Sequence, residues 1–314
     1  MSLVALIKGS RGESGFGYAS TASDVTSGID LSGKRALITG VNSGLGAETA
    51  RVLAERGAHI VGAARTLEKA EAALSAIGGN STPVACELSD LSSVAECAKA
   101  VSGLSEPLDI VICNAGIMAL AKLETIHGVE RQFFTNHIGH FTLVTGLLES
   151  LTDDARVVML SSAGHKLAPK GGVEFDNLSG AAGYSKWRAY GQSKLANLLF
   201  AVELGRRFEG SAKTANAVHP GVIQTKLGRH MGGALNMLFA ASGPLFTKTV
   251  GQGAATTCYV ATNPAVAGTK GAYFADCNVA KPSGHGRDAE LAEKLWDVSE
   301  EIVARVLEDS NRAA

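Results

Sequence analysis

The sequence predicts an α/β fold in which a doubly wound parallel sheet is covered by helices on both faces. From residue 34 onward, short β-branched runs alternate with amphipathic stretches. Such an alternation implies parallel strands joined by right-handed crossovers. A glycine-rich turn at residues 39–46 joins the first predicted strand to the first predicted helix. The 37 glycines and 46% hydrophobic residues are consistent with a sizeable core and many tight turns.

The predicted elements follow one another regularly along the chain. We expect strands at residues 36–39, 59–63, 83–86, 110–113, 157–160 and 215–218, and helices at residues 45–56, 67–77, 91–101 and 195–208. No repeat, low-complexity tract or proline-rich linker divides the chain. We therefore expect one domain at residues 31–314, with a sheet of about seven strands. Residues 1–30 are expected to form an N-terminal extension without visible chemistry.

The charge balance and the cysteine content argue against some classes of partner and of cellular location. The 29 basic and 30 acidic residues nearly cancel, which argues against a nucleic-acid partner or an acidic lipid surface. The five cysteines are scattered and odd in number, as is typical of a reducing compartment. The apolar run at residues 1–7 is too short for a membrane helix and is followed by Lys8 and Arg11. We expect a cytoplasmic protein without a membrane anchor.

The glycine turn predicts a nucleotide site. Gly40, Gly44 and Gly46 follow a predicted strand and open a predicted helix. In this context the backbone can approach a pyrophosphate, and the helix N–H groups point at it. The next predicted strand ends in Arg65, without the carboxylate that an NAD ribose requires. A guanidinium can bind a 2′-phosphate, so the sequence favours NADP(H) over NAD(H).

A second group of residues predicts acid–base chemistry. Tyr190 and Lys194 are four residues apart and share one helix face. There an ammonium can lower the pKa of a phenol, which is ordinarily about 10. Ser161 and Ser162 end the fifth predicted strand, at the sheet edge where open α/β sheets bind ligands. Asn136 lies in a predicted helix, where a polar amide needs a partner.

These motifs resemble the short-chain dehydrogenase/reductase superfamily, whose members carry Thr-Gly-x-x-x-Gly-x-Gly in a Rossmann-type fold. The resemblance covers about residues 30–310. It implies an enzyme acting on CH–OH donors with NAD(P)+ as acceptor, or a carbonyl reductase in the opposite direction. The cofactor-binding residues that the resemblance and the residue pattern point to are Gly40, Asn42, Ser43, Gly44, Leu45, Gly46, Arg65, Glu87, Leu88, Asn114, Ala115, Gly116, Tyr190, Lys194, Pro220, Gly221, Val222, Ile223 and Thr225.

The resemblance also implies a role for each of four catalytic residues. Tyr190 exchanges a proton with the substrate oxygen, and Lys194 lowers the pKa of Tyr190 and binds the nicotinamide ribose. Ser162, favoured over Ser161, holds the substrate oxygen. Asn136 orients Lys194 through a water. Cys113 stands where relatives usually have the first Asn of Asn-Asn-Ala-Gly, and Glu87 stands where they usually have Asp.

Longer motifs resemble the retinol dehydrogenase and WW-domain oxidoreductase branch. They include residues 136–141, residues 190–200 and residues 219–222. We expect the protein to differ from that branch in having neither WW modules nor a microsomal membrane anchor. Apolar residues at about 222–250 predict either a core helix or a lid over the site. We expect a hydrophobic small-molecule substrate of the retinoid, steroid or aromatic carbonyl class. Relatives often form homodimers or homotetramers.

Other functions remain as alternatives. Reduction of an activated C=C bond shares the Tyr and Lys, and a non-catalytic sensor or scaffold would keep the fold without turnover. No metal site is expected, because His137, His140 and His165 have no carboxylate or cysteine that completes a ligand set. A serine hydrolase is disfavoured, because Ser162 does not lie in a Gly-x-Ser-x-Gly elbow.

Overall fold

The computed structural model describes residues 11–223 and 247–313. Its centre is an eight-stranded sheet in the order β10-β9-β8-β7-β4-β1-β2-β3. All neighbouring strands are parallel except the β9–β10 pair. The strands are β1 (Arg35–Thr39), β2 (His59–Ala64), β3 (Ser81–Ala85), β4 (Leu108–Cys113), β7 (Leu151–Leu160), β8 (Thr214–His219), β9 (Tyr273–Ala275) and β10 (Asn278–Val279). A separate pair joins β5 (Thr125–Ile126) to β6 (Val129–Glu130).

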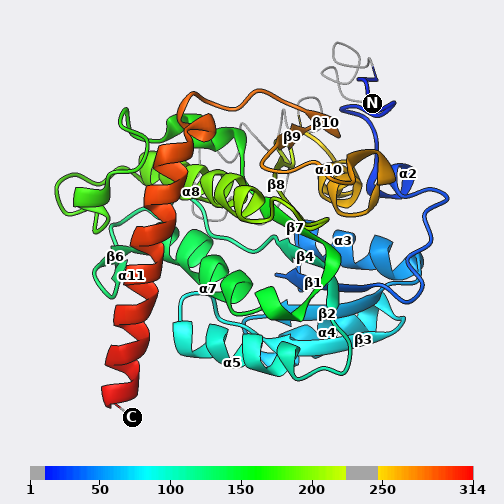
Figure 1. The fold of residues 1–314 in the computed structure, drawn as a ribbon, viewed down its shortest axis with the longest axis horizontal. Helices are drawn as coiled ribbons and strands as arrows, with labels where there is room; N and C mark the ends of the chain where they lie inside the picture. Colours follow the sequence, from blue (N-terminus) through cyan, green and yellow to red (C-terminus); the bar gives the residue numbers. More distant parts are fainter. Residues whose placement is uncertain (1–10, 224–246, 314) are drawn as a thin grey trace.

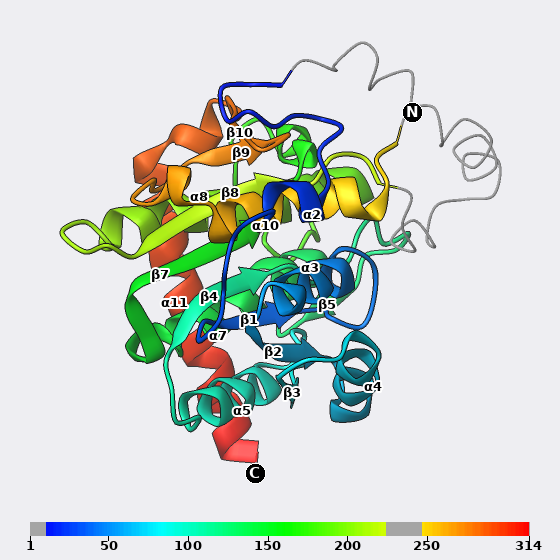
Figure 2. The ribbon, with the colours of Figure 1, turned by 90° about the vertical axis from the view of Figure 1, so that its right-hand side faces the viewer.

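Helices cover both faces of this sheet (Figures 1 and 2). One side carries α2 (Ala22–Val25), α3 (Gly44–Glu55), α4 (Leu67–Ile77) and α10 (Val250–Thr262). The other side carries α5 (Leu91–Ser102), α7 (Gly139–Thr145), α8 (Lys186–Arg207) and α11 (Ala289–Ala313). Short helical segments are α6 (Arg131–Phe133), η1 (Phe134–Ile138), η2 (Leu148–Ser150), η3 (Ala163–Leu167), η4 (Phe175–Asn177), η6 (Pro264–Val266) and η7 (His285–Arg287).

The central strands are apolar on both faces. Every residue of β1 is buried, and β4 is buried except at Asp109. Alternate side chains of β1 therefore enter different cores: Leu37 belongs to the core shared with α5, α7 and α8, whereas Ile38 belongs to the core shared with α3 and α10. A strand that is covered on both faces has a continuous run of apolar and β-branched residues, and this run is the sequence signal that predicted these strands.

The described part of the N-terminal extension packs on the α10 side of the body (Figure 2). The Phe16 ring makes an edge contact with Tyr259, with 5.8 Å between the ring centroids. Asn278 accepts a hydrogen bond from Ser14 N and donates one to the Phe16 carbonyl. Ala22 and Val25 of α2 belong to the same buried core as β1. The segment therefore contributes to the core, while the domain boundary expected at residue 30 stays a prediction.

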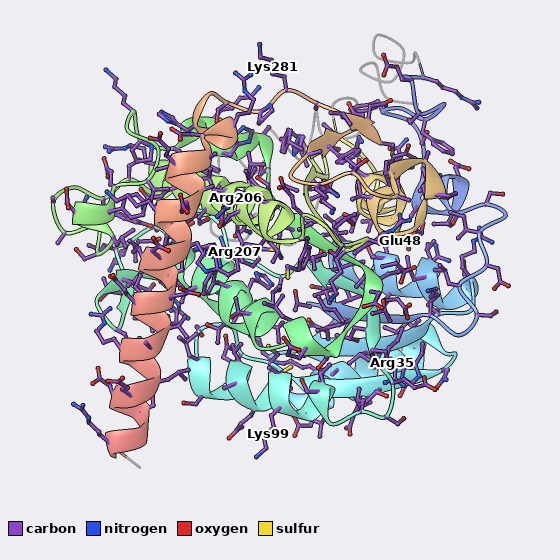
Figure 3. All side chains as sticks on the ribbon, in the orientation of Figure 1. Arg35, Glu48, Lys99, Arg206, Arg207 and Lys281 are labelled. Atoms are coloured by element: carbon purple, nitrogen blue, oxygen red, sulfur yellow. The ribbon has the colours of Figure 1, made fainter. Side chains whose placement is uncertain are left out.

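The far end of α8 is attached to α11 by charged side chains (Figure 3). The buried Glu203 accepts hydrogen bonds from Arg206 and Arg207 at 2.7–2.8 Å. The Arg207 guanidinium also lies over the Trp296 ring, 3.9 Å from its centroid. This contact combines apolar packing with a cation–π attraction and joins the end of α8 to α11.

The predicted α/β class with a doubly wound parallel sheet is confirmed. The six expected strands are present, and β9 and β10 extend the sheet to eight strands instead of about seven. The largest difference in boundaries concerns α8, which begins at Lys186 and not at residue 195. In the ranges that the structure describes, no helix is long and apolar enough to cross a membrane.

Candidate functional site

The glycine turn lies where the sheet order reverses between β1 and β4, the position at which doubly wound sheets bind ligands. Gly40 and Gly44 have φ values of +76° and +57°, which glycine adopts without strain. A Cβ on Gly46 would clash with the Gly40 carbonyl and lie 2.6 Å from Asn114 Nδ2. The turn is therefore folded closely against the start of α3, whose first amides have no partner within the helix. This arrangement suits a pyrophosphate.

Thr39 joins the glycine turn to the loop after β4. Its Oγ1 accepts hydrogen bonds from the backbone N–H groups of Asn114 and Ala115, both at 3.0 Å. The Asn114 side chain in turn donates to the Thr39 carbonyl at 2.8 Å. A Cβ on Gly40 would lie 3.2 Å from Ala115 Cβ. The two loops thus form one cradle with a backbone floor.

The remaining nucleotide-site candidates lie beside this cradle. Arg65 is exposed directly after β2, and the carbonyl of Ala63 accepts from Gly40 N at 2.7 Å. Arg65 therefore lies close to the cradle. The Glu87 carboxylate accepts from the backbone N–H and hydroxyl of Ser89. Leu88 is buried in the core, so its side chain is directed away from a surface site.

Asn136 lies in the π-helical turn η1, where the Gly139 N–H donates to the Phe134 carbonyl. Such turns are frequent at functional sites because they interrupt the regular helix. The Asn136 side chain is fully buried. It accepts from Ile117 N at 2.8 Å and donates to Ile117 O at 2.9 Å and Ser193 Oγ at 3.0 Å. All its amide hydrogens are thereby used, so the side chain is held in one orientation.

Tyr190 and Lys194 both lie on α8, as the four-residue spacing predicted, and both are buried. Lys194 Nζ donates to the Leu160 carbonyl at 2.8 Å and lies 6.0 Å from the Tyr190 ring centroid. Burial lowers the pKa of Lys194 to about 8. A Cβ on Gly116 would lie 3.0 Å from Asn136 Oδ1 and 3.5 Å from Lys194 Nζ, so the backbone at Gly116 passes close to both groups.

The pKa of Tyr190 differs from the sequence-based expectation. Burial raises this pKa, and the hydrogen bond with the Ser162 side chain lowers it by less. Lys194 is not among the causes of this shift, because its ammonium is directed at the Leu160 carbonyl and is itself desolvated, and the lowering expected from Lys194 stays a prediction. Burial therefore favours the neutral phenol over the phenolate.

The adjacent serines have different roles in the structure. Ser161 Oγ is buried and donates to the Lys194 carbonyl at 2.7 Å, which ties β7 to α8. Ser162 begins η3, and its Oγ accepts from Gly164 N at 3.0 Å and interacts with Tyr190. A Cβ on Gly164 would lie 2.8 Å from the Tyr190 ring. Ser162 is therefore the serine that faces the phenol.

The turn after β8 reaches the same edge. His219 Nδ1 accepts from Ala163 N at 3.1 Å and from Gly221 N at 3.4 Å, and so it connects the Ser162 loop to the Pro220-Gly221 turn. Val222 is exposed and Ile223 pairs with Lys248. Thr225 and most of the predicted lid lie outside the described residues.

Sequence patterns did not reveal several residues that organise this site. Thr39, Ser193 and His219 act through bonds to distant segments, although each lies inside or beside a motif. Gly191 is a further example, since a Cβ there would lie 2.7 Å from Ala168 N in the loop that follows Ser162. A glycine between Tyr190 and Gln192, within a helical stretch, was the feature of the sequence that could have revealed this close contact.

A cavity of about 580 Å³ lies elsewhere, between residues 171–183 and α11. Its walls include Phe175, Arg188 and Lys294, and none of the four predicted catalytic residues. Convergent chemistry, rather than cavity size, therefore identifies the candidate site at the carboxyl edge of the sheet.

Several known proteins are similar to this chain in sequence. The profile of the short chain dehydrogenase family matches residues 34–234. Short-chain dehydrogenase TIC 32 B, chloroplastic, of Brassica napus is 43% identical over 317 residues, covering 96% of this chain and 99% of that protein. Retinol dehydrogenase 11 of Mus musculus is 40% identical over 284 residues, covering 87% of each chain.

Solved structures agree with the sequence comparisons. A crystal structure of a protein from Mycobacterium paratuberculosis has a TM-score of 0.73 and 36% identity, covering 90% of this chain and 97% of its own. A blue fluorescent protein from a metagenomic library, in complex with NADPH, has a TM-score of 0.63 and 26% identity. It covers 78% of this chain and 97% of its own.

Proposed function

Because the chain belongs to the short-chain dehydrogenase/reductase family, and so is an oxidoreductase acting on CH–OH donors with a nicotinamide dinucleotide, we propose that it interconverts a hydrophobic alcohol and its carbonyl compound with NADP(H). The observation that carries this proposal is the meeting of Tyr190, Ser162 and Lys194 beside the glycine cradle. One edge of the sheet therefore carries the proposed proton donor Tyr190, the Ser162 hydroxyl proposed to bind the substrate oxygen, and the cofactor cradle.

The residues present fit a dinucleotide. The Gly40–Gly46 contact leaves backbone where a side chain would block a pyrophosphate, and Gly116 leaves open backbone beside Lys194. When bound, the nicotinamide supplies or accepts the hydride. Arg65 would bind a 2′-phosphate, which supports NADP(H) over NAD(H). The NADPH complex of a structural relative supports the same preference.

Each side chain of the site has one proposed task. Ser162 binds the substrate oxygen by a hydrogen bond. Tyr190 donates the proton to that oxygen during reduction and accepts it during oxidation. Lys194 binds the nicotinamide ribose. Asn136 holds the loop at Ile117 in place, and its expected water-mediated contact with Lys194 stays a prediction. The residues after β8, Pro220 to Ile223 with Thr225, orient the carboxamide.

Apolar side chains at the carboxyl edge of the sheet favour a hydrophobic substrate. The Trp187 ring makes an edge contact with the Tyr190 ring, with 6.4 Å between centroids. Leu167 of η3 and Val222 of the cofactor turn are both exposed apolar residues, at 51% and 57%. Small-molecule sites are lined mostly by apolar side chains around a few polar groups. A retinoid, steroid or aromatic carbonyl suits such walls.

A substrate panel tests the proposal. The purified protein is incubated with NADPH and with a retinoid aldehyde, a steroid ketone, an aromatic ketone and an enone, and cofactor oxidation and products are measured. We expect carbonyl reduction of at least one member, with an alcohol as product. Saturation of the enone C=C bond would favour the alternative reductase. Tight NADPH binding without any turnover would favour a non-catalytic protein.

Location and assembly stay predictions. The sequence favours a cytoplasmic protein, whereas the relative from Brassica napus is named as a chloroplastic protein. A homodimer or homotetramer is the assembly expected from the family.

A further inference from the structure

His140 of α7 connects the cofactor cradle to the proposed catalytic centre through buried hydrogen bonds. Its ring is fully buried. Nε2 lies 2.9 Å from Thr39 Oγ1, at the end of β1, and Nδ1 lies 2.9 Å from the Asn136 carbonyl in η1. The ring therefore spans the distance between two segments that the proposed function requires in fixed positions.

Donor counting assigns the tautomer of His140. Thr39 Oγ1 already accepts from the backbone N–H groups of Asn114 and Ala115. A hydroxyl has two acceptor lone pairs and one donor, so its hydrogen is directed at His140 Nε2. Nε2 is thus an acceptor, and Nδ1–H donates to the Asn136 carbonyl. The ring is neutral, in agreement with burial lowering its pKa to about 4.

The same bonds continue to Tyr190. Asn136 Nδ2 donates to Ser193 Oγ at 3.0 Å, and Ser193 Oγ donates to the Tyr190 carbonyl at 2.8 Å. Asn136 and Ser193 are fully buried, so water does not replace these bonds. These hydrogen bonds form one connected network that runs from the backbone of the cradle through Thr39, His140 and Asn136 to α8. The donor and the acceptor of each bond are defined. Fully satisfied buried networks of this kind hold their members rigidly.

We propose that His140 is a positioning residue that holds the glycine cradle and Asn136 at a fixed separation, so that cofactor and Tyr190 meet in register. The inference rests on the proposed function. It requires both ring nitrogens, because one accepts from Thr39 and the other donates to Asn136. An apolar ring at this position would keep the packing but separate the two segments.

His137 offers a matched control. It lies one turn earlier, is also fully buried, and burial lowers its pKa to about 3. Its Nε2 bonds to Ser299 Oγ of α11 at 2.9 Å, away from the cradle. The substitutions His137→Phe and His140→Phe therefore remove one buried imidazole each from neighbouring turns, and only the second breaks the connection to Thr39.

The test compares wild type, His140→Phe, His140→Gln and His137→Phe. NADPH affinity is measured by fluorescence titration, turnover by steady-state kinetics on the substrate found in the panel, and Tm by thermal melting. Loss of a buried hydrogen-bond pair predicts that His140→Phe weakens NADPH binding and lowers kcat by about tenfold each. His137→Phe should change both by less than about twofold, with a comparable drop in Tm. Gln carries one donor and one acceptor and should recover part of the loss.

The outcomes separate this inference from the proposed function. If His140→Phe and His137→Phe have the same NADPH affinity and kcat at similar Tm, His140 is merely structural and the inference is wrong. If wild type itself fails to bind NADPH, the proposed function is wrong. Should His140→Phe fail to fold, His140→Gln decides the question: its NADPH affinity and kcat must lie measurably below those of His137→Phe, and equality would overturn the inference.

Discussion

Ser161 Oγ donates a hydrogen bond to the backbone carbonyl of Lys194 at 2.7 Å. This contact uses the first serine of the pair to hold α8 against β7, and it leaves the second serine beside the Tyr190 phenol. Two adjacent residues of one type thus have separable functions, because successive residues of an extended segment point to opposite sides.

The serine pair should respond differently to alanine substitution. Ser162→Ala removes a group that binds the substrate oxygen, so kcat should fall by about 10²–10³ with little change in stability. Ser161→Ala removes a buried hydrogen bond and should lower the free energy of unfolding by about 1–2 kcal/mol while retaining most of kcat. Kinetics and urea unfolding of both variants check this. The opposite pattern would assign the substrate oxygen to Ser161.

Arg65 should determine cofactor choice. Arg65→Ala removes the guanidinium proposed for the 2′-phosphate, so the Kd for NADPH should rise by roughly tenfold or more while the Kd for NADH stays close to wild type. Lys99→Ala is a matched control, since Lys99 is an exposed cation on α5 that points away from the body in Figure 3. Equal losses in both variants would indicate a general charge effect and no phosphate site.

Gly46→Ala should prevent dinucleotide binding. A Cβ at this position clashes with the Gly40 carbonyl and with Asn114, so the turn must open. We expect loss of NADPH binding in a titration, with a lower Tm. Gly171→Ala serves as the control, because a Cβ on Gly171 meets no atom within 4 Å. Unchanged NADPH affinity in Gly46→Ala would show that the cradle is not the pyrophosphate site.

The buried Lys194 predicts a pH-dependent stability difference. Its pKa is lowered to about 8 from an ordinary value of 10.5. Between these pH values the unfolded state binds more protons than the folded state, so wild type gains stability as pH rises. Relative to Lys194→Met, the gain across this window should approach roughly 3 kcal/mol. Urea unfolding at pH values across the window measures it, and a constant difference would contradict the shifted pKa.

Most of the sheet was predictable because its strands are buried on both faces. A strand such as β4 reads as an apolar run between polar turns, whatever lies around it. By contrast, β9 and β10 contain three and two residues, too few for a periodic signal. The packing of Phe16 on Tyr259 was also unpredictable, because the two residues are far apart in sequence and neither lies in a motif.

Residues of the candidate site were predictable from the sequence where they come directly after a predicted strand or share one face of a helix. Gly40, Ser162 and the Tyr190–Lys194 pair were found in this way. The connections among them were not, because hydrogen bonds such as that between Thr39 and His140 join residues 101 positions apart. The raised pKa of Tyr190 was missed for a related reason: spacing places Lys194 on the same face, but only the fold shows burial and the direction of the ammonium.

The central claim is that Tyr190 exchanges the proton with the substrate oxygen, and Tyr190→Phe tests it most directly. The variant keeps the ring and removes only the hydroxyl. Turnover should fall by about 10²–10⁴, while the Kd for NADPH from fluorescence titration stays within about threefold of wild type. Near wild-type turnover in Tyr190→Phe, with the cofactor bound normally, would contradict the account.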